Sequence, residues 1–166
     1  MLKQNTLPDH VDPFRFADNA VNLQGILYIN DMQRLGSALY ATDGEVEVKA
    51  TFGVDDQGTR FLRGKLAASV LLPCQRCLES FEYAIKSDFL LGIVRSEKEA
   101  EQLPKNYDPV IVTEEKLVLQ DVFEDELIVN LPVVSMHELD DCKVKLPLEI
   151  GTKIETGKES PFKVLK

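Results

Sequence analysis

The stretch of sequence that decides the fold reads Glu45-Val46-Glu47-Val48-Lys49-Ala50-Thr51-Phe52-Gly53-Val54. Apolar side chains occupy every second position, and charged or polar side chains fill most of the positions between them. Successive side chains of a β-strand point to opposite faces, so a period of two predicts a strand with one face on a core and the other in water. The residues expected on the core face are Val46, Val48, Ala50, Phe52 and Val54.

Two further alternating stretches follow, over residues 62–72 and 81–93. The turn residues Asp55-Asp56-Gln57-Gly58 precede the first of them, and Cys74-Gln75-Arg76-Cys77 separates it from the second. Three long strands with short connections predict an antiparallel meander or a partly open barrel. One face of this sheet is apolar, so helices are needed to cover it.

Helical patterns on both sides of these strands indicate an α+β protein with two or three helices. After a strand at 21–29, Asn30 can cap a short helix, and Ser96 with Glu99 fits a capping box that opens another. An edge strand is expected at 107–112, and residues 113–130 predict the best amphipathic helix. We expect a single domain over residues 1–166, with an extended or partly docked arm at 1–20, the core at 21–134, and a loop with a flexible tail at 135–166.

Composition places the chain among ordinary globular proteins. Its 166 residues are 44% hydrophobic and 28% charged. A disordered protein or a fibrous repeat would have a different composition. There is no apolar run of the roughly 20 residues that cross a bilayer, and the first residues lack the apolar segment of a secretory signal. The expected location is therefore the cytosol, where the three cysteines are reduced thiols or metal ligands.

Charge limits the class of partner. With a net charge of -9 the protein is poorly suited to bind RNA unaided, because phosphate binding needs a basic face. An acidic surface suits a basic protein such as a ribosomal protein, although the charge can also serve solubility alone. Residues 113–141 hold nine acids and a single lysine. We expect Asp121, Glu124 and Asp125 on the outward face of the helix, as partner-binding residues.

The C-terminal residues reverse this charge. From Lys143 onward six lysines oppose three glutamates. Such a tail can reach RNA or fold back on the acidic helix, and the second behaviour is the commoner one.

One motif has chemical content, the pair Cys74 and Cys77 in the connection between the second and third long strands. Two cysteines separated by two residues in a tight turn can direct both sulfurs to one tetrahedral zinc ion. His137 and Cys142 can complete a Cys3His set. The alternative is that these cysteines are small core residues and that the histidine is solvated. A redox pair is disfavoured, because redox pairs lie at a helix N-terminus.

Catalytic signatures are otherwise missing from the sequence. It has no Gly-rich phosphate loop, no nucleophile elbow and no zinc-protease helix motif. The acids Glu124-Asp125-Glu126 can in principle bind Mg²⁺, but a run of acids on a helix is more often a solvated surface. The sequence therefore favours a binding protein over an enzyme.

Several segments, in this order, resemble the bacterial YceD family, the large ribosomal RNA subunit accumulation proteins. They are Cys74-Gln75-Arg76-Cys77-Leu78, Val94-Arg95-Ser96 through Leu103-Pro104 to Tyr107-Asp108-Pro109, Glu124-Asp125-Glu126-Leu127-Ile128, Leu131-Pro132-Val133-Val134, His137 with Cys142, and Pro161-Phe162-Lys163-Val164-Leu165. The resemblance implies a role in the synthesis, processing or stability of 23S rRNA, with no catalytic residues. Some relatives carry a fuller cysteine cluster near the C-terminus, where this sequence has only Cys142.

These observations lead to three hypotheses of different classes. The first is a non-catalytic accessory factor that binds a ribosomal protein or a precursor particle of the large subunit through its acidic helix and exposed sheet face. The second is a module that binds rRNA directly through cations near one end of the sheet and the lysine tail. The third is an RNA-processing enzyme. The cations of the second hypothesis are Arg60, Arg63, Lys65 and Arg76.

Overall fold

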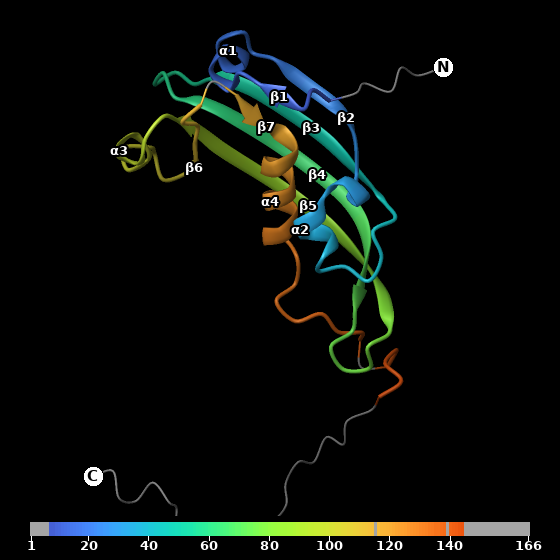
Figure 1. Cartoon of the computed structure of the whole chain (residues 1–166). Helices are drawn as coiled ribbons and strands as arrows, with labels where there is room; N and C mark the ends of the chain where they lie inside the picture. Colours follow the sequence, from blue (N-terminus) through green and yellow to red (C-terminus); the bar gives the residue numbers. More distant parts are fainter. Residues whose placement is uncertain (1–6, 115, 139, 145–166) are drawn as a thin grey trace, which may run out of the picture.

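The computed structural model of the protein describes residues 7–114, 116–138 and 140–144. At its centre lies an open five-stranded sheet with the strand order β2-β3-β4-β5-β6 (Figure 1). The first four strands are antiparallel neighbours, whereas β6 runs parallel to β5. The predicted α+β meander is confirmed, and the sheet is open. Its strands are β2 (Asn22–Tyr28), β3 (Glu45–Val54), β4 (Arg60–Pro73), β5 (Ser80–Val94) and β6 (Asp108–Ile111).

Short helices and a two-stranded sheet cover the inner face of the curved sheet. β1 (His10–Val11) pairs with β7 (Leu117–Val118). Figure 1 shows α4 and α2 lying beside each other against the sheet, with α1 near one end of it. The helices are α1 (Pro13–Asp18), α2 (Gln33–Gly36), α3 (Glu97–Ala100) and α4 (Leu119–Val129), and a 3-10 turn at Ile29–Asp31 precedes α2.

The core forms where the alternating apolar residues of β3, β4 and β5 meet the helices. Gly64 lies opposite Phe89 in the β4–β5 register, and the Phe89 ring lies over the glycine. The same ring contacts Phe123 of α4, with ring centroids 6.2 Å apart. Because Gly64 has no side chain, the aromatic ring can occupy the space between sheet and helix. The expected core face of β3 is confirmed for Val46, Val48, Ala50 and Phe52, whereas Val54 is exposed at the end of the strand.

The N-terminal segment is docked, one of the two arrangements expected of the arm, and it contains a short helix that the sequence analysis did not predict. The Asp12 carboxylate accepts hydrogen bonds from the backbone N–H groups of Phe14 and Arg15, which caps α1. Phe16 then packs edge to face on Phe52 of the core. Asp12 followed by Pro13 is a helix-start signal, but α1 is too short to show a helical period.

Two other predicted elements differ in extent or direction. The amphipathic helix begins at Leu119 and not near residue 113, because β7 pairs with β1 just before it. The expected edge strand is present as β6, but parallel to β5, since the short helix α3 lies in the connection between them. The capping box is confirmed: Ser96 accepts from the N–H of Glu99, and Glu99 accepts from the N–H of Arg95.

The flexible tail predicted from the sequence lies outside the described residues, apart from positions up to 144. None of the helices in the described part of the chain has the length and apolarity of a membrane span.

The contact between Gly64 and Phe89 predicts the effect of adding one methyl group. In Gly64→Ala the new Cβ would stand 2.1 Å from the Phe89 ring, so the ring must shift and its packing against Phe123 is disturbed. We expect the free energy of unfolding to fall by about 2–3 kcal/mol, measured by urea denaturation. Phe89→Leu in the same chain should recover part of this loss, so that the double variant is less destabilised than the two single variants summed. Additive losses would contradict the contact.

Candidate metal centre

Two cysteines are positioned by the tight connection between β4 and β5. The N–H of Cys74 donates to the carbonyl oxygen of Glu79 at 2.8 Å, which closes the hairpin, and the N–H of Leu78 donates back to the carbonyl of Cys74 at 2.8 Å. Leu78 has a φ of 63°, in the left-handed region that a non-glycine residue rarely adopts. This backbone turns sharply enough to place Cys74 and Cys77 on one side of the connection.

The chain that follows α4 binds this connection through its backbone. The N–H of Gln75 donates to the carbonyl of Ser135 at 2.8 Å. Arg76 donates through Nη2 to the carbonyl of His137 at 3.0 Å. Lys143 then forms an ion pair with Glu79. These contacts carry the second half of the cysteine and histidine set, more than fifty residues away in sequence, to the hairpin.

The predicted set of four meets at one point. The ligand atoms of Cys74, Cys77, His137 and Cys142 all lie within 4.8 Å of one another, and Cys77 Sγ is 3.3 Å from His137 Nδ1. With Zn–S bonds of about 2.3 Å, a tetrahedral ion separates its sulfurs by roughly 3.8 Å. The donors present therefore fit a tetrahedral zinc ion after shifts of about 1 Å or less.

The electrostatics of the four residues also suit a cation. Burial raises the pKa of the Cys74 thiol, but N–H groups of Cys77, His137 and Arg76 stabilise the thiolate and lower its pKa to about 5. At Cys77 the N–H of Glu79 lowers the pKa, but burial and the sulfurs of Cys74 and Cys142 outweigh it and raise the pKa. A bound cation would stabilise both thiolates, because it places positive charge between them.

The alternative of ordinary core cysteines fits less well. Cys74 and Cys142 are buried, yet both lie outside the main apolar cluster that the sheet and helices form. All three cysteines are free thiols. They cluster with one another and with His137, which is the arrangement of metal ligands.

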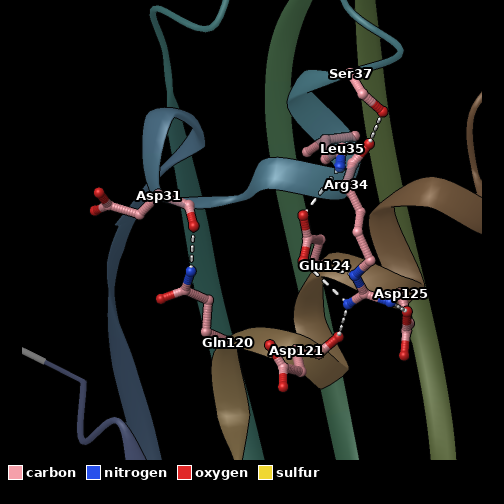
Figure 2. A network of polar contacts seen from close by, with 8 residues as sticks. All are labelled: Asp31, Arg34, Leu35, Ser37, Gln120, Asp121, Glu124 and Asp125. Carbon is pink, nitrogen blue, oxygen red and sulfur yellow. Dashed lines mark hydrogen bonds and ion pairs between the residues drawn. The ribbon is translucent and has the colours of Figure 1, made fainter.

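On α4, Glu124 is not on the outward face where the sequence predicts it. It is 4% exposed, and its Oε1 accepts from the backbone N–H of Leu35 at 2.9 Å. Its other oxygen pairs with Arg34, as Figure 2 shows. The carboxylate accepts from a backbone N–H of α2 that has no partner within that short helix. The predicted Asn30 cap is wrong, because Asn30 lies in the 3-10 turn and Met32 precedes α2. The expectation of a solvent-facing Glu124 is therefore wrong, because its position in α4 faces α2.

Asp121 and Asp125 are exposed on α4, as the sequence predicts. Asp125 shares the Arg34 guanidinium with Glu124, and these two carboxylates raise the pKa of Arg34. Gln120 reaches the carbonyl oxygen of Asp31 at 2.6 Å (Figure 2). The contacts of Arg34 and Gln120 were not predicted, because their partners lie about ninety residues away in sequence and no local pattern indicates such pairs. The partner-binding role of these acids stays a prediction.

The four cations of the direct RNA-binding hypothesis do not lie together. Arg60 pairs with Asp18, and Lys65 pairs with Asp88. Arg63 lies near them on β4 and contacts the Phe61 ring. Arg76 lies beyond the opposite end of β4, against His137. The expectation that all four share one end of the sheet is wrong, because β4 is long enough to separate them.

Together, the open meander and the hairpin with its Cys3His set define an α+β protein with a candidate metal centre at one end. Comparison with known proteins adds the family: residues 62–166 match the family model described as large ribosomal RNA subunit accumulation protein YceD. A curated relative of that name from Haemophilus influenzae is 32% identical over 173 residues, covering 99% of this chain and 97% of the relative. The chain belongs to this family. No solved structure matches it.

The buried carboxylate of Glu124 should contribute more to stability than the exposed acids of α4. Glu124→Ala leaves the buried N–H of Leu35 without an acceptor, so we expect the free energy of unfolding to fall by about 2–3 kcal/mol. Asp121→Ala, on the exposed side of the same helix, should change it by less than about 0.5 kcal/mol. Urea denaturation of both variants checks this. Equal effects would show that Glu124 contributes no more to stability than a surface acid.

Proposed function

We propose that this protein is a non-catalytic accessory factor of the cytosol that supports accumulation of 23S rRNA, by binding a ribosomal protein or a precursor particle of the large subunit. Its family membership carries the proposal, since the match covers nearly the whole chain and the family is named for large ribosomal RNA subunit accumulation. Binding is the favoured mode, because the two histidines are not placed for acid-base work. His10 is exposed in β1, and His137 belongs to the Cys3His set.

A protein partner is favoured by charge. The net charge is -9, and exposed acids continue from α4 to the metal centre. The proposed contact surface, here called the acidic surface, excludes the buried Glu124. Its residues are Asp121, Asp125, Glu138, Asp140 and Asp141. A basic protein can approach this surface with electrostatic attraction, whereas RNA phosphates would be repelled.

Direct rRNA binding has less support. Of its four cations, Arg60 and Lys65 have acidic partners, and Arg76 donates to a backbone carbonyl at the other end of β4. Phosphate contacts along an RNA chain need several cations on one face, because each releases counterions only where it meets a phosphate. Of the four, Arg63 alone provides too few phosphate contacts, and most of the lysine tail lies outside the described residues.

We also propose that Cys74, Cys77, His137 and Cys142 bind one zinc ion with a structural role. All four positions are taken by protein donors, which is the arrangement of structural and not of catalytic zinc sites. The ion would hold the chain after α4 against the β4–β5 hairpin, and would thereby fix the acids at 138–141 relative to those of α4.

Zinc is tested on the protein as purified. We expect one zinc per chain by elemental analysis, and a thermal midpoint that falls by about 5 °C or more when a chelator removes the ion. Cys142→Ser should lose the zinc and melt like the chelated protein. Met136→Ser, a control at an exposed position of the same segment, should retain the zinc and the thermal midpoint of the parent. A protein without zinc whose melting ignores the chelator would show that the cysteines are ordinary thiols.

The acidic surface is tested by reversing charge at two places. Asp121→Lys with Asp125→Lys should leave the fold intact, since both side chains are exposed, but should lower large-subunit levels in cells that rely on the variant. The control variant, Glu97→Lys with Glu101→Lys, makes the same change of net charge at exposed positions of α3. It should support normal large-subunit levels in the same cells. Sucrose-gradient profiles measure both.

Equal complementation by the two variants would exclude the acidic surface as the contact. A gel-shift experiment with naked 23S rRNA fragments at physiological salt separates the alternatives. Weak binding is expected, and a sub-micromolar, sequence-selective complex would favour the RNA-binding hypothesis. Cleavage of the fragments by the purified protein would favour the enzyme.

A further inference from the structure

The free edges of the sheet are protected unequally. β6 is only four residues long and contains Asp108 and Pro109, and the part of β5 that β6 leaves unpaired carries Glu82, Lys86 and Asp88. Short strands, proline and charge are the usual means of preventing an edge from pairing with another chain. β2 has none of them. Its seven residues read Asn22-Leu23-Gln24-Gly25-Ile26-Leu27-Tyr28, and its register with β3 runs without a bulge.

The backbone groups on the free edge of β2 follow from its pairing with β3. The N–H of Phe52 donates to the carbonyl of Val21, and the N–H of Ile29 donates to the carbonyl of Gly44. Both bonds join residues that lie directly opposite in the register, so the odd-numbered residues of β2 point their backbone groups at β3. The even-numbered residues point theirs outward. In the described part of the chain, β3 is the only strand that pairs with β2.

The side chains beside this edge favour one kind of occupant. All four even-numbered side chains are exposed and uncharged, and Ile26 and Tyr28 are 41% and 45% exposed. Their partners across the β3 register are Glu47 and Glu45. A strand added to the edge would lie about 9–10 Å from β3, which long basic side chains can span to reach the two carboxylates.

We propose that the free edge of β2 binds an extended segment of a partner protein as an added strand. Backbone hydrogen bonds to Gln24 and Ile26 hold the segment, its apolar side chains lie against Ile26 and Tyr28, and its lysines or arginines reach Glu45 and Glu47. A second copy of this chain is a poorer occupant, because it also carries a net charge of -9 and β2 has no basic residue. The site is independent of the acidic surface on α4, so either can fail without the other.

The full-length protein can be tested by amide hydrogen exchange observed by NMR. In the free protein the amides of Gln24 and Ile26 should exchange fast, whereas those of Leu23 and Leu27, bonded to β3, should exchange slowly. The probe is a short synthetic peptide with blocked ends in which every second residue is valine or lysine in turn, with threonine between them, so that valine and lysine side chains lie on the face of Ile26, Tyr28 and the two glutamates. It should slow the Gln24 and Ile26 amides by about tenfold or more, and the same peptide with glutamate in place of lysine should not.

A pair of variants at one position identifies the backbone as the contact. Gln24→Pro removes the outward N–H and places the ring where the added strand would lie, so peptide affinity should fall about tenfold or more. Gln24→Ala retains the N–H and should bind within about twofold of the parent. Unchanged slow exchange of the β3 amides shows that the sheet of each variant is intact.

Four results would overturn the proposal. Slow exchange of Gln24 and Ile26 in the free protein at every concentration would mean that the chain covers its own edge. Slow exchange that develops only as protein concentration rises would identify a second copy as the occupant. Absence of slowing by the lysine peptide, or equal affinity of Gln24→Pro and Gln24→Ala for it, would show that the edge does not take an added strand.

Discussion

The structure depends on covering the inner face of a long, curved sheet, and the central contact is the Phe89 ring between Gly64 and Phe123. A glycine in the middle of a strand normally weakens it, but here it creates the space into which the aromatic ring fits. The helix that brings Phe123 also brings Glu124, whose carboxylate binds α2. One helix therefore joins the sheet by apolar burial and joins its neighbouring helix by a buried polar contact.

At the far end of the sheet a different chemistry replaces the apolar core. The β4–β5 hairpin ends in a connection whose one buried residue is Cys74, outside the apolar cluster. The chain after α4 is held there by hydrogen bonds from the Gln75 N–H and the Arg76 guanidinium to its backbone carbonyls, which place His137 beside Cys77. Three sulfurs and an imidazole within 4.8 Å of one another are the donor set of a structural zinc site, so the geometry and the donor set support the same proposal.

Local patterns predicted the sheet well, because the period of two in β3, β4 and β5 is a direct consequence of burying one face. The pairing of Cys74 and Cys77 with His137 and Cys142 was also predictable, since few residue types bind zinc and the chain has few of them. Glu124 was not. An amphipathic pattern assigns every charged residue to water, and only the distant N–H of Leu35 makes this position suitable for a buried carboxylate. The helix α1 was missed because six residues are too few to show a period.

The two central strands are long enough for the two ends of the sheet to unfold separately. β4 has fourteen residues and so extends over roughly 45–50 Å, from the aromatic contacts near α1 to the cysteine turn. The two ends are thus stabilised by independent means, apolar packing at one and, in the proposed zinc-bound protein, ligation at the other. Agents that capture zinc or oxidise thiols then act on the hairpin tip alone, and they would release the segment after α4 while the body stays folded. Stability would be divided into two units along a single continuous ladder of hydrogen bonds, and only one of them would respond to the metal and redox state of its surroundings.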